Sequence, residues 1–317
     1  MCHLSVIVLT HNPSWEKLKA TILSVLNQEK VWIELIIADD GSLKRFDEEI
    51  KVLCERHGLL NVKFSSLRNN IGTVGNITAA LRMATAPYVK LISPGDFVFS
   101  SDSLEKWCYF MEESDADISF GDAVYYREES GNYKLIKQTR APIQTRLYEN
   151  YNRRGLMVDC LMVNDNILGA SIMIKTDLLK RYMELFNGKV KYAEDYFVRL
   201  AVFEQKKIMH FPQNIIWYEY GLGISTNKKN QWKSLLYNDF VESNKLIMNE
   251  CMASDRISRR YVFYLKNESK NKIIKKIKKC LMFPDVILWK LKNLNSGNKT
   301  DTNVDSKQLR FYLGLPD

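Results

Sequence analysis

The sequence lacks the signatures of several protein classes. Its six cysteines form no C-x-x-C pair, and it holds only four histidines. These features argue against a zinc site and against the disulfide framework of a secreted protein, so free thiols in a reducing cytosol are the default expectation. The apolar run Leu4–Leu9 is too short for a signal peptide, and no stretch approaches the ~20 continuous apolar residues of a membrane-spanning helix. We therefore expect neither element.

Charge of one sign is in excess. The chain has 46 Lys and Arg residues against 37 Asp and Glu residues, a formal net charge of +9. Such a balance suits a nucleic acid, a membrane surface or a phosphate-bearing ligand, and does not choose among them. Because no segment matches an aromatic-lined nucleic-acid-binding fold, we expect no nucleic-acid partner.

The first hundred residues alternate between apolar strands and amphipathic helices. Strands are predicted at 4–9, 32–38, 62–65 and 88–92, and Ser14 is a candidate N-cap for a helix that begins at Trp15. This rhythm predicts a mostly parallel, doubly wound α/β sheet. Polar clusters follow three of the strands, at 10–12, 39–40 and 93–96. Ligands of such sheets bind outside the carboxyl ends of the strands, so these clusters are expected to converge.

The remaining chain predicts a second half and an extension. Helices are expected at 103–113, 175–186 and 194–204, and strands at 116–126, 167–174, 208–211 and 215–220, with a hairpin turn at Gly131–Asn132. Beyond about residue 228 the pattern becomes helical and basic. We therefore divide the chain into residues 1–226, with a nucleotide-binding half at 1–100 and an acceptor half at 101–226, and a helical region at 227–317.

Five short segments, in this order, resemble family 2 glycosyltransferases, which are inverting enzymes on the GT-A fold. They are Ser5 to Asn12, Asp39-Asp40-Gly41-Ser42, Asn70-x-Gly72 with Asn76 and Ala80, Glu194-Asp195, and Gly221 to Ser225. The similarity covers residues 4 to about 226. It implies a GT-A-type α/β domain with a C-terminal helical extension. One departure stands out, because Ser93 and Gly95 replace acids of the family's D-x-D-D-type motif and only Asp96 remains.

The resemblance implies that the first half binds a nucleotide-sugar donor, which we expect to be a UDP-sugar. It assigns recognition of the base chiefly to Asp40, with His11, Asp39 and Asn70 as further donor-binding residues; His11 stands where the family often has Tyr. As a turn, Asp-Asp-Gly-Ser is equally ordinary, and a packed histidine explains His11 as well.

The leaving diphosphate needs a cation. Mg²⁺ or Mn²⁺ prefers oxygen ligands and often uses one or two carboxylates plus the phosphates, so Asp96 is the candidate metal ligand. Lys90 or Arg68 is the alternative source of positive charge. Asp96 is also a common residue type for a turn after Pro-Gly.

Asp195 is the candidate catalytic base. An inverting transfer is one in-line displacement, which needs a group to take the proton of the acceptor hydroxyl. Glu194 beside it raises the pKa of Asp195 by like-charge repulsion, whereas a helix N-terminus lowers that pKa, and the pattern leaves the sum open. Arg199, at i+4, is expected to pair with Asp195 and orient it.

Two further segments have candidate roles. Residues 138–154 are rich in Arg and Tyr, which suits either an acceptor site or a solvated loop. Residues 266–292 form a basic amphipathic pattern with Trp289, typical of a helix in an anionic membrane interface. A helix packed on the main domain and a nucleic-acid-binding arm are the alternatives for this tail. Residues 295–306 are polar, and we expect them to be mobile.

The sequence thus predicts a cytoplasmic, peripherally membrane-bound inverting glycosyltransferase of polysaccharide biosynthesis. It would transfer a sugar to a hydroxyl of a glycan, including a lipid-linked one. A non-catalytic sugar-nucleotide-binding or scaffold protein is the alternative, because two acids are missing at 93 and 95. A nucleotidylyltransferase is disfavoured, because residues 10–13 are not the glycine-rich basic loop that it needs after its first strand.

Overall fold

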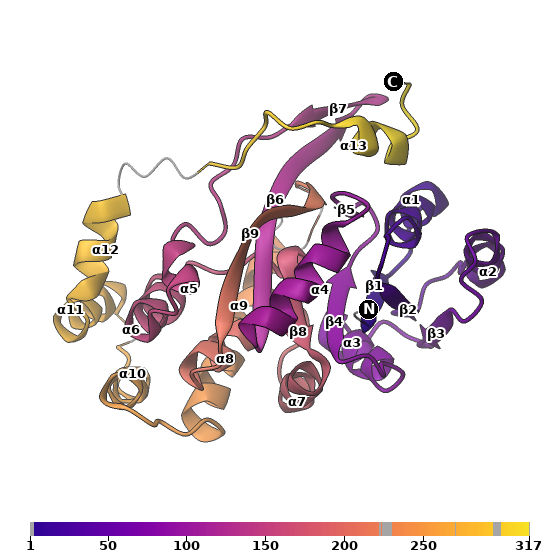
Figure 1. The fold of residues 1–317 in the computed structure, drawn as a ribbon. Coiled ribbons are helices and arrows are strands. Elements are labelled where there is room, and N and C mark those ends of the chain that lie inside the picture. Colours follow the sequence, from indigo (N-terminus) through magenta and orange to yellow (C-terminus); the bar gives the residue numbers. More distant parts are fainter. Residues whose placement is uncertain (1–2, 222, 224–229, 270, 294–298, 317) are drawn as a thin grey trace.

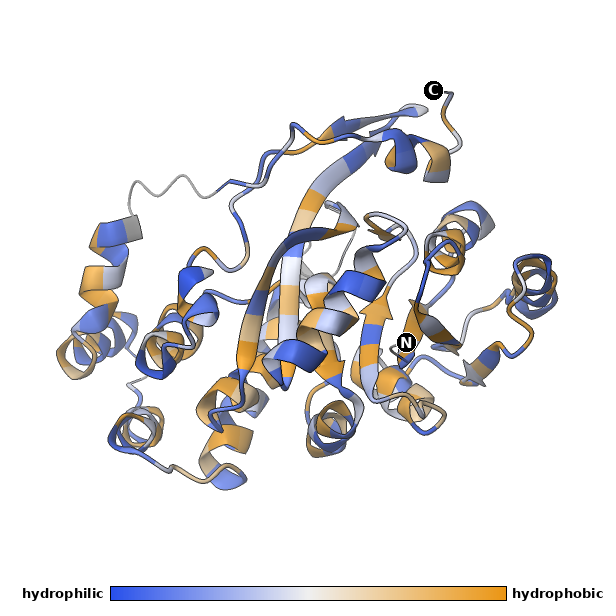
Figure 2. Ribbon diagram, viewed as in Figure 1, coloured by the Kyte–Doolittle hydropathy of each residue, from blue (hydrophilic) through white to orange (hydrophobic). Residues whose placement is uncertain are grey.

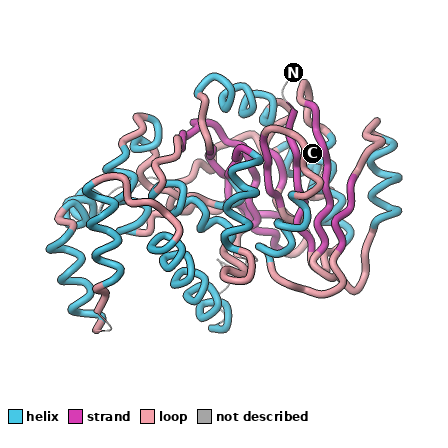
Figure 3. The backbone as a smooth tube through the Cα atoms, turned by 90° about the horizontal axis from the view of Figure 1, so that it is seen from below, coloured by secondary structure: helices cyan, strands magenta, loops and turns pink. Residues whose placement is uncertain are grey.

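A computed structural model describes residues 3–221, 223, 230–269, 271–293 and 299–316. These residues form one nine-stranded sheet with the strand order β3-β2-β1-β4-β8-β6-β9-β5, to which β7 adds beside β6 (Figure 1). Helices lie on both sides of the sheet, and a further group stands beyond one edge of it (Figure 3). The predicted α/β class is confirmed.

The first half of the sheet is parallel. It consists of β1 (His3–Thr10), β2 (Trp32–Asp39), β3 (Lys63–Ser66) and β4 (Tyr88–Ile92). The connecting helices are α1 (Trp15–Leu26), α2 (Asp47–Arg56) and α3 (Thr73–Leu81). The side-chain oxygen of Ser14 accepts the N–H of Lys17 at 3.3 Å, so Ser14 caps α1 as predicted. Because the four strands run the same way, the residues that follow them lie along one rim.

The second half of the sheet is mixed. The strand β8 (Ile172–Lys175) is antiparallel to β4 and to β6 (Ile118–Glu129). The strand β9 (Ile208–Glu219) runs parallel to β6, while β5 (Phe97–Val98) and β7 (Asn132–Leu135) are antiparallel to β9 and β6. Since β8 begins where β4 ends, the start of β8 and the continuation of β6 beyond Phe120 reach the same rim as the ends of the parallel strands.

Both faces of the sheet are covered by helices. Alternate residues of β1 take part in two different cores, because successive side chains of a strand point to opposite faces. Leu4, Val6 and Val8 pack with α1, α2 and α4 (Ser103–Ser114), whereas Ile7 packs with α3, α7 (Thr176–Phe186) and α8 (Phe197–Phe203). Burial on both sides explains why these strands read as continuous apolar runs.

Three predicted elements differ from the structure. The strand expected at 167–174 begins only at Ile172, after a 3₁₀ turn at Gly169–Ser171. The helix expected at 194–204 is a 3₁₀ turn, Glu194–Tyr196, followed by α8. The two strands expected at 208–220 are one strand, β9, because a bulge opposite Gly121 and Asp122 interrupts the alternation of side chains without ending the pairing.

The basic stretch 138–154 and the residues after it are largely helical and partly buried. Residues 146–163 form α5 (Arg146–Glu149), α6 (Arg153–Leu156) and a π-helix (Met157–Val163). Buried Tyr148 packs edge-to-face on Phe120, with ring centroids 4.8 Å apart. Tyr148 is therefore a core residue and not a sugar-stacking side chain.

The C-terminal region packs on the α/β domain. Its helices are α9 (Asn230–Asn249), α10 (Arg256–Lys266), α11 (Lys272–Met282), α12 (Asp285–Asn293) and α13 (Lys307–Tyr312). Leu246, Ile247 and Tyr261 of α9 and α10 belong to the same core as α3, α7 and α8. The predicted boundary at 226 lies outside the described residues.

The end of the chain returns to the sheet. The N–H of Thr300 donates to the carbonyl of Gln138 at 2.8 Å, and Leu309 and Tyr312 of α13 pack on Phe97 of β5. In Figure 1 the yellow segment that ends in α13 runs across the top of the sheet, and α13 lies beside β7 and α1. Residues 299–306, part of the segment that we expected to be mobile and of the region that we expected to be helical, are instead an extended segment bound to the sheet domain.

We predict that Leu309→Ala lowers the free energy of unfolding by about 2–5 kcal/mol, because Leu309 is fully buried between α13 and the sheet. Phe311→Ala, in the same helix but 61% exposed, is expected to change it by less than about 0.5 kcal/mol. Urea denaturation of both variants checks this. Equal, small effects would mean that α13 is not part of the folded domain.

Candidate active site

Two aspartates at the end of β2 bind backbone and hydroxyl groups of neighbouring loops. The carboxylate of Asp39 accepts the hydroxyl of Thr10 and the N–H of Ser42, both at 2.8 Å. The two oxygens of Asp40 accept the N–H groups of Ile71 and Gly72, at 2.8 and 2.9 Å. Carboxylates that accept backbone N–H groups form strong, charge-assisted hydrogen bonds. The Asp-Asp-Gly-Ser turn therefore fixes the loop 69–72 beside it.

His11 and Asn70 lie at the exposed edge of this turn. A ring nitrogen of His11 (Nδ1) is 2.9 Å from the carbonyl oxygen of Asp40, which places the imidazole beside the Asp-Asp turn. Asn70 is exposed and precedes the two N–H groups that bind Asp40. The structure thus brings four of the predicted donor-binding residues, His11, Asp39, Asp40 and Asn70, to one place, while their roles stay predictions.

Asp96 follows β4 on the same rim, next to a carboxylate that sequence reasoning missed. One oxygen of Asp96 accepts the N–H of Glu219 at 3.0 Å, and both residues are largely buried. Gly95 has a φ of +103°, and a Cβ atom there would collide with the carboxylate of Glu219. Glu219, from the end of β9, therefore fills the space into which an acid at position 95 would project. It pairs with Lys17 of α1.

Burial controls the charge state of this cluster. It raises the pKa of Asp96 to about 7, against the lowering effects of the Glu219 N–H and of Lys90. Burial also lowers the pKa of Lys90 to about 7. The ammonium of Lys90 donates to the carbonyls of Leu91 and Ala170, so this lysine connects β4 to the turn before β8. Lys90 is therefore poorly placed as the alternative cation for a diphosphate.

Glu194 and Asp195 lie on a 3₁₀ turn that precedes α8. Together with Leu91 of β4, Gly169 and Ile172, they line a pocket with about 260 Å³ of empty space, part of it open to solvent. A Cβ atom at Gly169 would lie 3.2 Å from the Cβ of Asp195, so the missing side chain allows the turn before β8 to approach the acid closely. Leu91 immediately precedes the end of the strand that leads to Asp96. The pocket of Asp195 thus adjoins the rim that carries the other acids.

The pKa values of the two acids are raised. Burial raises the pKa of Asp195 to about 6, although its own backbone N–H lowers it. Burial and, secondarily, the charge of Asp195 raise the pKa of Glu194 to about 8. The two carboxyl groups titrate as a pair. The pKa of Asp195 that the pattern left open is therefore raised, and the cause is burial and not the charge of Glu194.

A buried aspartate of the C-terminal region positions the loop before these acids. Asp239 of α9 accepts the N–H groups of Lys191, Tyr192 and Ala193, at 3.0, 2.7 and 2.9 Å. The carbonyl of Lys191 in turn accepts the N–H of Val74, the second residue of α3. This chain of bonds links the loop of Asp195 to the helix that follows the Asp40 loop. Sequence reasoning missed Asp239 because nothing local distinguishes it from an ordinary helical acid.

The predicted pair of Arg199 with Asp195 is wrong. Arg199 is buried in α8 and donates to the side chains of Asn164 and Asn244 at 3.0 and 2.9 Å, and to the hydroxyl of Tyr261 at 3.1 Å. Its guanidinium also lies over the ring of Phe240, 4.5 Å from the centroid. Because Asp195 precedes α8 on a 3₁₀ turn, the i+4 spacing does not place the two side chains on one helical face. Arg199 instead holds the helices of the C-terminal region to α8.

The basic stretch 138–154 is only partly at the site. Arg140 lines a second pocket, whereas Arg153 and Arg154 bind Gln205 and Asp285 at the surface. The motif Gly221 to Ser225 lies mostly outside the described residues. In the part of the chain that the structure describes, no three His, Cys, Asp or Glu side chains gather as a metal site of protein ligands alone.

Comparison with known proteins places this geometry in a family. The family model of Glycosyl transferase family 2 matches residues 5–180, which is more than half of the chain. The chain belongs to glycosyl transferase family 2. A curated relative from Haemophilus influenzae, described as an uncharacterized glycosyltransferase, is 28% identical over 137 residues. The match covers 43% of this chain and 53% of that relative, so the chain is matched to about half of the relative's length.

Solved structures of other proteins share the fold. Residues 1–349 of TarS from S. aureus in complex with UDP-GlcNAc superpose with a TM-score of 0.60 at 17% identity, covering 90% of this chain and 81% of that one. The mannosyltransferase PcManGT from Pyrobaculum calidifontis, in complex with GDP-Man and Mn²⁺, gives a TM-score of 0.56 at 11% identity, covering 92% and 74%. At these identities the likeness shows that this family 2 chain has the GT-A fold.

We predict that Asp239→Asn destabilises the fold by about 1.5–3 kcal/mol, because an amide cannot replace a carboxylate that accepts three buried N–H groups. Glu242→Gln on the same helix, which loses a surface pair with Lys245, is the matched control and should cost less than about 1 kcal/mol. Urea denaturation and amide exchange at 191–193 measure both variants. Unchanged exchange in Asp239→Asn would contradict this assignment.

Proposed function

We propose that this chain is an inverting glycosyltransferase that moves one sugar from a UDP-sugar to a hydroxyl of a glycan. One observation carries the proposal: Asp40 and Asp96 follow the parallel strands on either side of β1, and the pocket of Asp195, distant in sequence, is lined by Leu91 near the end of β4. The match covers only 53% of the curated relative, so the activity and substrates of this chain are proposals. Membership of the family supports them.

In this proposal Asp195 is the base. An acceptor hydroxyl in the pocket of Asp195 gives its proton to the carboxylate as its oxygen attacks the anomeric carbon, and the nucleoside diphosphate leaves from the opposite side. With a pKa of about 6, Asp195 is ionised at neutral pH and still basic enough to take the proton. Glu194, with a pKa of about 8, is protonated there and adds no second charge beside the base.

The donor side is assigned to the turn at the end of β2. Asp40 with His11, Asn70 and Asp39 would hold the nucleoside, since their polar groups and the loop 69–72 form one surface. The choice of UDP is supported by the structure of TarS, which shares the fold and holds UDP-GlcNAc. The non-catalytic alternative loses its motive, because Glu219 supplies a carboxylate where the sequence lacks an acid.

We further propose that Mg²⁺ or Mn²⁺ binds at Asp96 and Glu219. Two adjacent carboxylates fit such an ion, which commonly takes its remaining ligands from water and the substrate phosphates. Glu219 fits because its carboxylate occupies the space beside Gly95, and PcManGT, which shares the fold, holds Mn²⁺. When bound, the metal would stabilise the charge that develops on the leaving diphosphate. Lys17 is the cation that it would displace from Glu219.

The assignment of Asp195 is tested with Asp195→Asn. Turnover of the UDP-sugar, followed as hydrolysis or transfer, should fall by about 10²–10⁴-fold, because the variant lacks the base. Binding of UDP should stay within about twofold, and Asp177→Asn, an exposed acid of α7, should behave as the wild type. Near-normal turnover by Asp195→Asn with intact donor binding would falsify the proposal.

The same assignment fixes the pH profile. Since the base works when deprotonated, kcat/KM should fall about tenfold for each pH unit below the pKa of about 6 and level off above it. In Asp195→Asn the residual rate should lose this limb.

The metal proposal is tested by the binding of UDP. Mn²⁺ should increase the thermal stabilisation by UDP several-fold relative to EDTA, and Glu219→Gln should remove that increase while leaving the stabilisation by UDP alone. Glu128→Gln, which changes the second, more exposed acid near Lys17, is the control. Identical stabilisation in Mn²⁺ and EDTA would count against a metal at this site.

We also propose that the chain lies on the cytoplasmic face of a membrane through α11 and α12. Apolar and polar residues alternate along both helices (Figure 2), and no residue of α11 is buried. Ile273 and Leu281 are 69% and 75% exposed, and the lysines beside them are 272, 275, 276, 278 and 279. An apolar face with a basic border fits an anionic lipid surface, where each lysine adds ~1 kcal/mol. In the described residues no helix is long and apolar enough to cross a membrane.

Surface contact of this kind supports a lipid-linked acceptor in polysaccharide assembly, and vesicles test it. The chain should sediment with phosphatidylglycerol vesicles and not with phosphatidylcholine vesicles. Leu281→Asp should weaken binding about tenfold or more, because it removes an apolar group from the interface. Leu43→Asp changes a leucine outside these helices that is even more exposed, at 97%, and should leave binding unchanged. Equal binding of both variants would exclude this face.

A further inference from the structure

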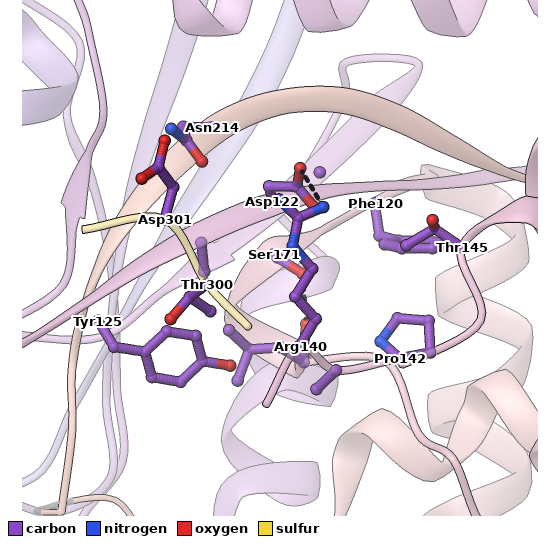
Figure 4. A pocket seen from close by; sticks show the side chains of 14 residues that line it. Phe120, Asp122, Tyr125, Arg140, Pro142, Thr145, Ser171, Asn214, Thr300 and Asp301 are labelled. Atoms are coloured by element: carbon purple, nitrogen blue, oxygen red, sulfur yellow. Dashed lines mark hydrogen bonds and ion pairs between the residues drawn. The ribbon is translucent and has the colours of Figure 1, made fainter. Parts of the chain in front are cut away.

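A second pocket lies on the far side of the turn before β8. It is a shallow hollow with about 340 Å³ of empty space, part of it open to solvent. Its walls come from five parts of the chain: residues 120–125 of β6, Asn214 in the bulge of β9, the segment 140–145, the turn 168–171 and Thr300–Asp301 near the C-terminus. Figure 4 shows polar side chains from these segments pointing toward one another around the pocket.

The pocket is built around the carboxylate of Asp122. One oxygen lies 3.2 Å from a guanidinium nitrogen of Arg140, drawn as the dashed line in Figure 4. The other lies 3.2 Å from Nε2 of buried His210, whose Nδ1 is 3.0 Å from Glu149. Two partners on two oxygens hold the carboxylate in one orientation. Asp122 is thus a preorganised acceptor of hydrogen bonds.

The other polar groups match a polyhydroxylated ligand. Asn214, the strand partner of Asp122 across the bulge, and exposed Asp301 add an amide and a second carboxylate to the rim of the pocket, and the ring of Tyr125 forms part of a wall. Arg140 is already paired with Asp122, so the two acids leave a net negative charge that disfavours a phosphate or a carboxylate. Carboxylates, an amide and an aromatic wall suit the hydroxyls and faces of a neutral sugar.

The position of the pocket assigns the sugar to the acceptor. In the strand order, Asp40 follows β2, the pocket of Asp195 lies at β4 and β8, and Asp122 lies on β6, the next strand. Only the turn 168–171 separates the last two, since Gly169 lines the pocket of Asp195 while Leu168 and Ser171 line the second pocket. Asp195 therefore lies between a ligand in this pocket and the Asp40 loop, where the nucleotide is proposed to bind.

We propose that this pocket binds a neutral sugar residue of the acceptor glycan, with Asp122 and Asp301 receiving its hydroxyls. The inference rests on the proposed function, because it names the acceptor side of the same reaction. The C-terminal segment takes part directly: Arg140 donates through Nε to the carbonyl of Lys299 at 3.3 Å, and buried Thr300 bonds to the backbone of Gln138. Recognition of the acceptor therefore depends on residues near the end of the chain.

The experiment measures binding of methyl glycosides to the full chain by saturation-transfer NMR. The panel contains the methyl glycosides of glucose, galactose, mannose and N-acetylglucosamine, with inorganic phosphate as the anionic probe. At least one glycoside should bind, and Asp122→Asn and Asp301→Asn should each weaken it about tenfold, the loss expected for a charge-assisted hydrogen bond. Asp115→Asn makes the same change at an 86%-exposed side chain outside the pocket and should leave binding unchanged.

If Asp122→Asn fails to fold, Asp301→Asn still tests the proposal, because Asp301 is exposed and its replacement should not affect folding. The proposal is overturned if no glycoside binds, if binding is equal in Asp301→Asn and the wild type, or if phosphate binds here instead. UDP stabilisation is measured on the same samples. If UDP binds and no glycoside does, the acceptor pocket is contradicted and the proposed function is not. If UDP does not bind, the proposed function is contradicted, and the glycoside result is judged separately.

Discussion

A buried carboxylate that accepts several backbone N–H groups is the interaction on which this site depends. Asp239 holds three consecutive N–H groups of the loop before Glu194 and Asp195, and Asp40 holds two of the loop before α3. Loops cannot be fixed by apolar packing alone, because their backbone groups need partners. Charged acceptors meet that need with strong bonds, so these two irregular segments are held in place beside the sheet.

This arrangement makes the C-terminal region a part of the site. Asp239 belongs to α9, which packs through Arg199 and its neighbours on α8, and the chain end at 299–301 lines the second pocket. The parallel half of the sheet carries the Asp40 loop and Asp96, while the loop before Asp195 is positioned by a helix about forty residues further along the chain. The geometry of the candidate site therefore depends on residues beyond the first 226.

Much of the first half could be predicted from the sequence, because its signals are local. Buried strands of the parallel sheet read as apolar runs, Ser14 marks a helix start, and polar residues follow each strand directly. The second half resisted for a physical reason. The bulge in β9, opposite Asp122, split that strand into two apparent strands, and a buried π-helix at Met157–Val163 gave no clear periodicity.

The partners of site residues were harder still, because they are distant in sequence. Asp239, Glu219 and Asp122 look like ordinary surface acids, and only tertiary packing reveals what each of them binds. Arg199 shows the opposite error: a favourable i+4 spacing suggested a pair with Asp195, and the 3₁₀ turn before α8 removed it. Spacing rules hold within one regular helix and fail across its first turn.

The central claim is that the donor-binding residues and the catalytic base Asp195 lie along one rim of the sheet. A crystal structure of the chain with UDP tests it most directly. The account predicts density for the uracil ring beside Asp40 and His11, with the diphosphate directed toward Asp96 and the pocket of Asp195. A nucleotide bound on any other surface, or one whose diphosphate points away from Asp195, would contradict it.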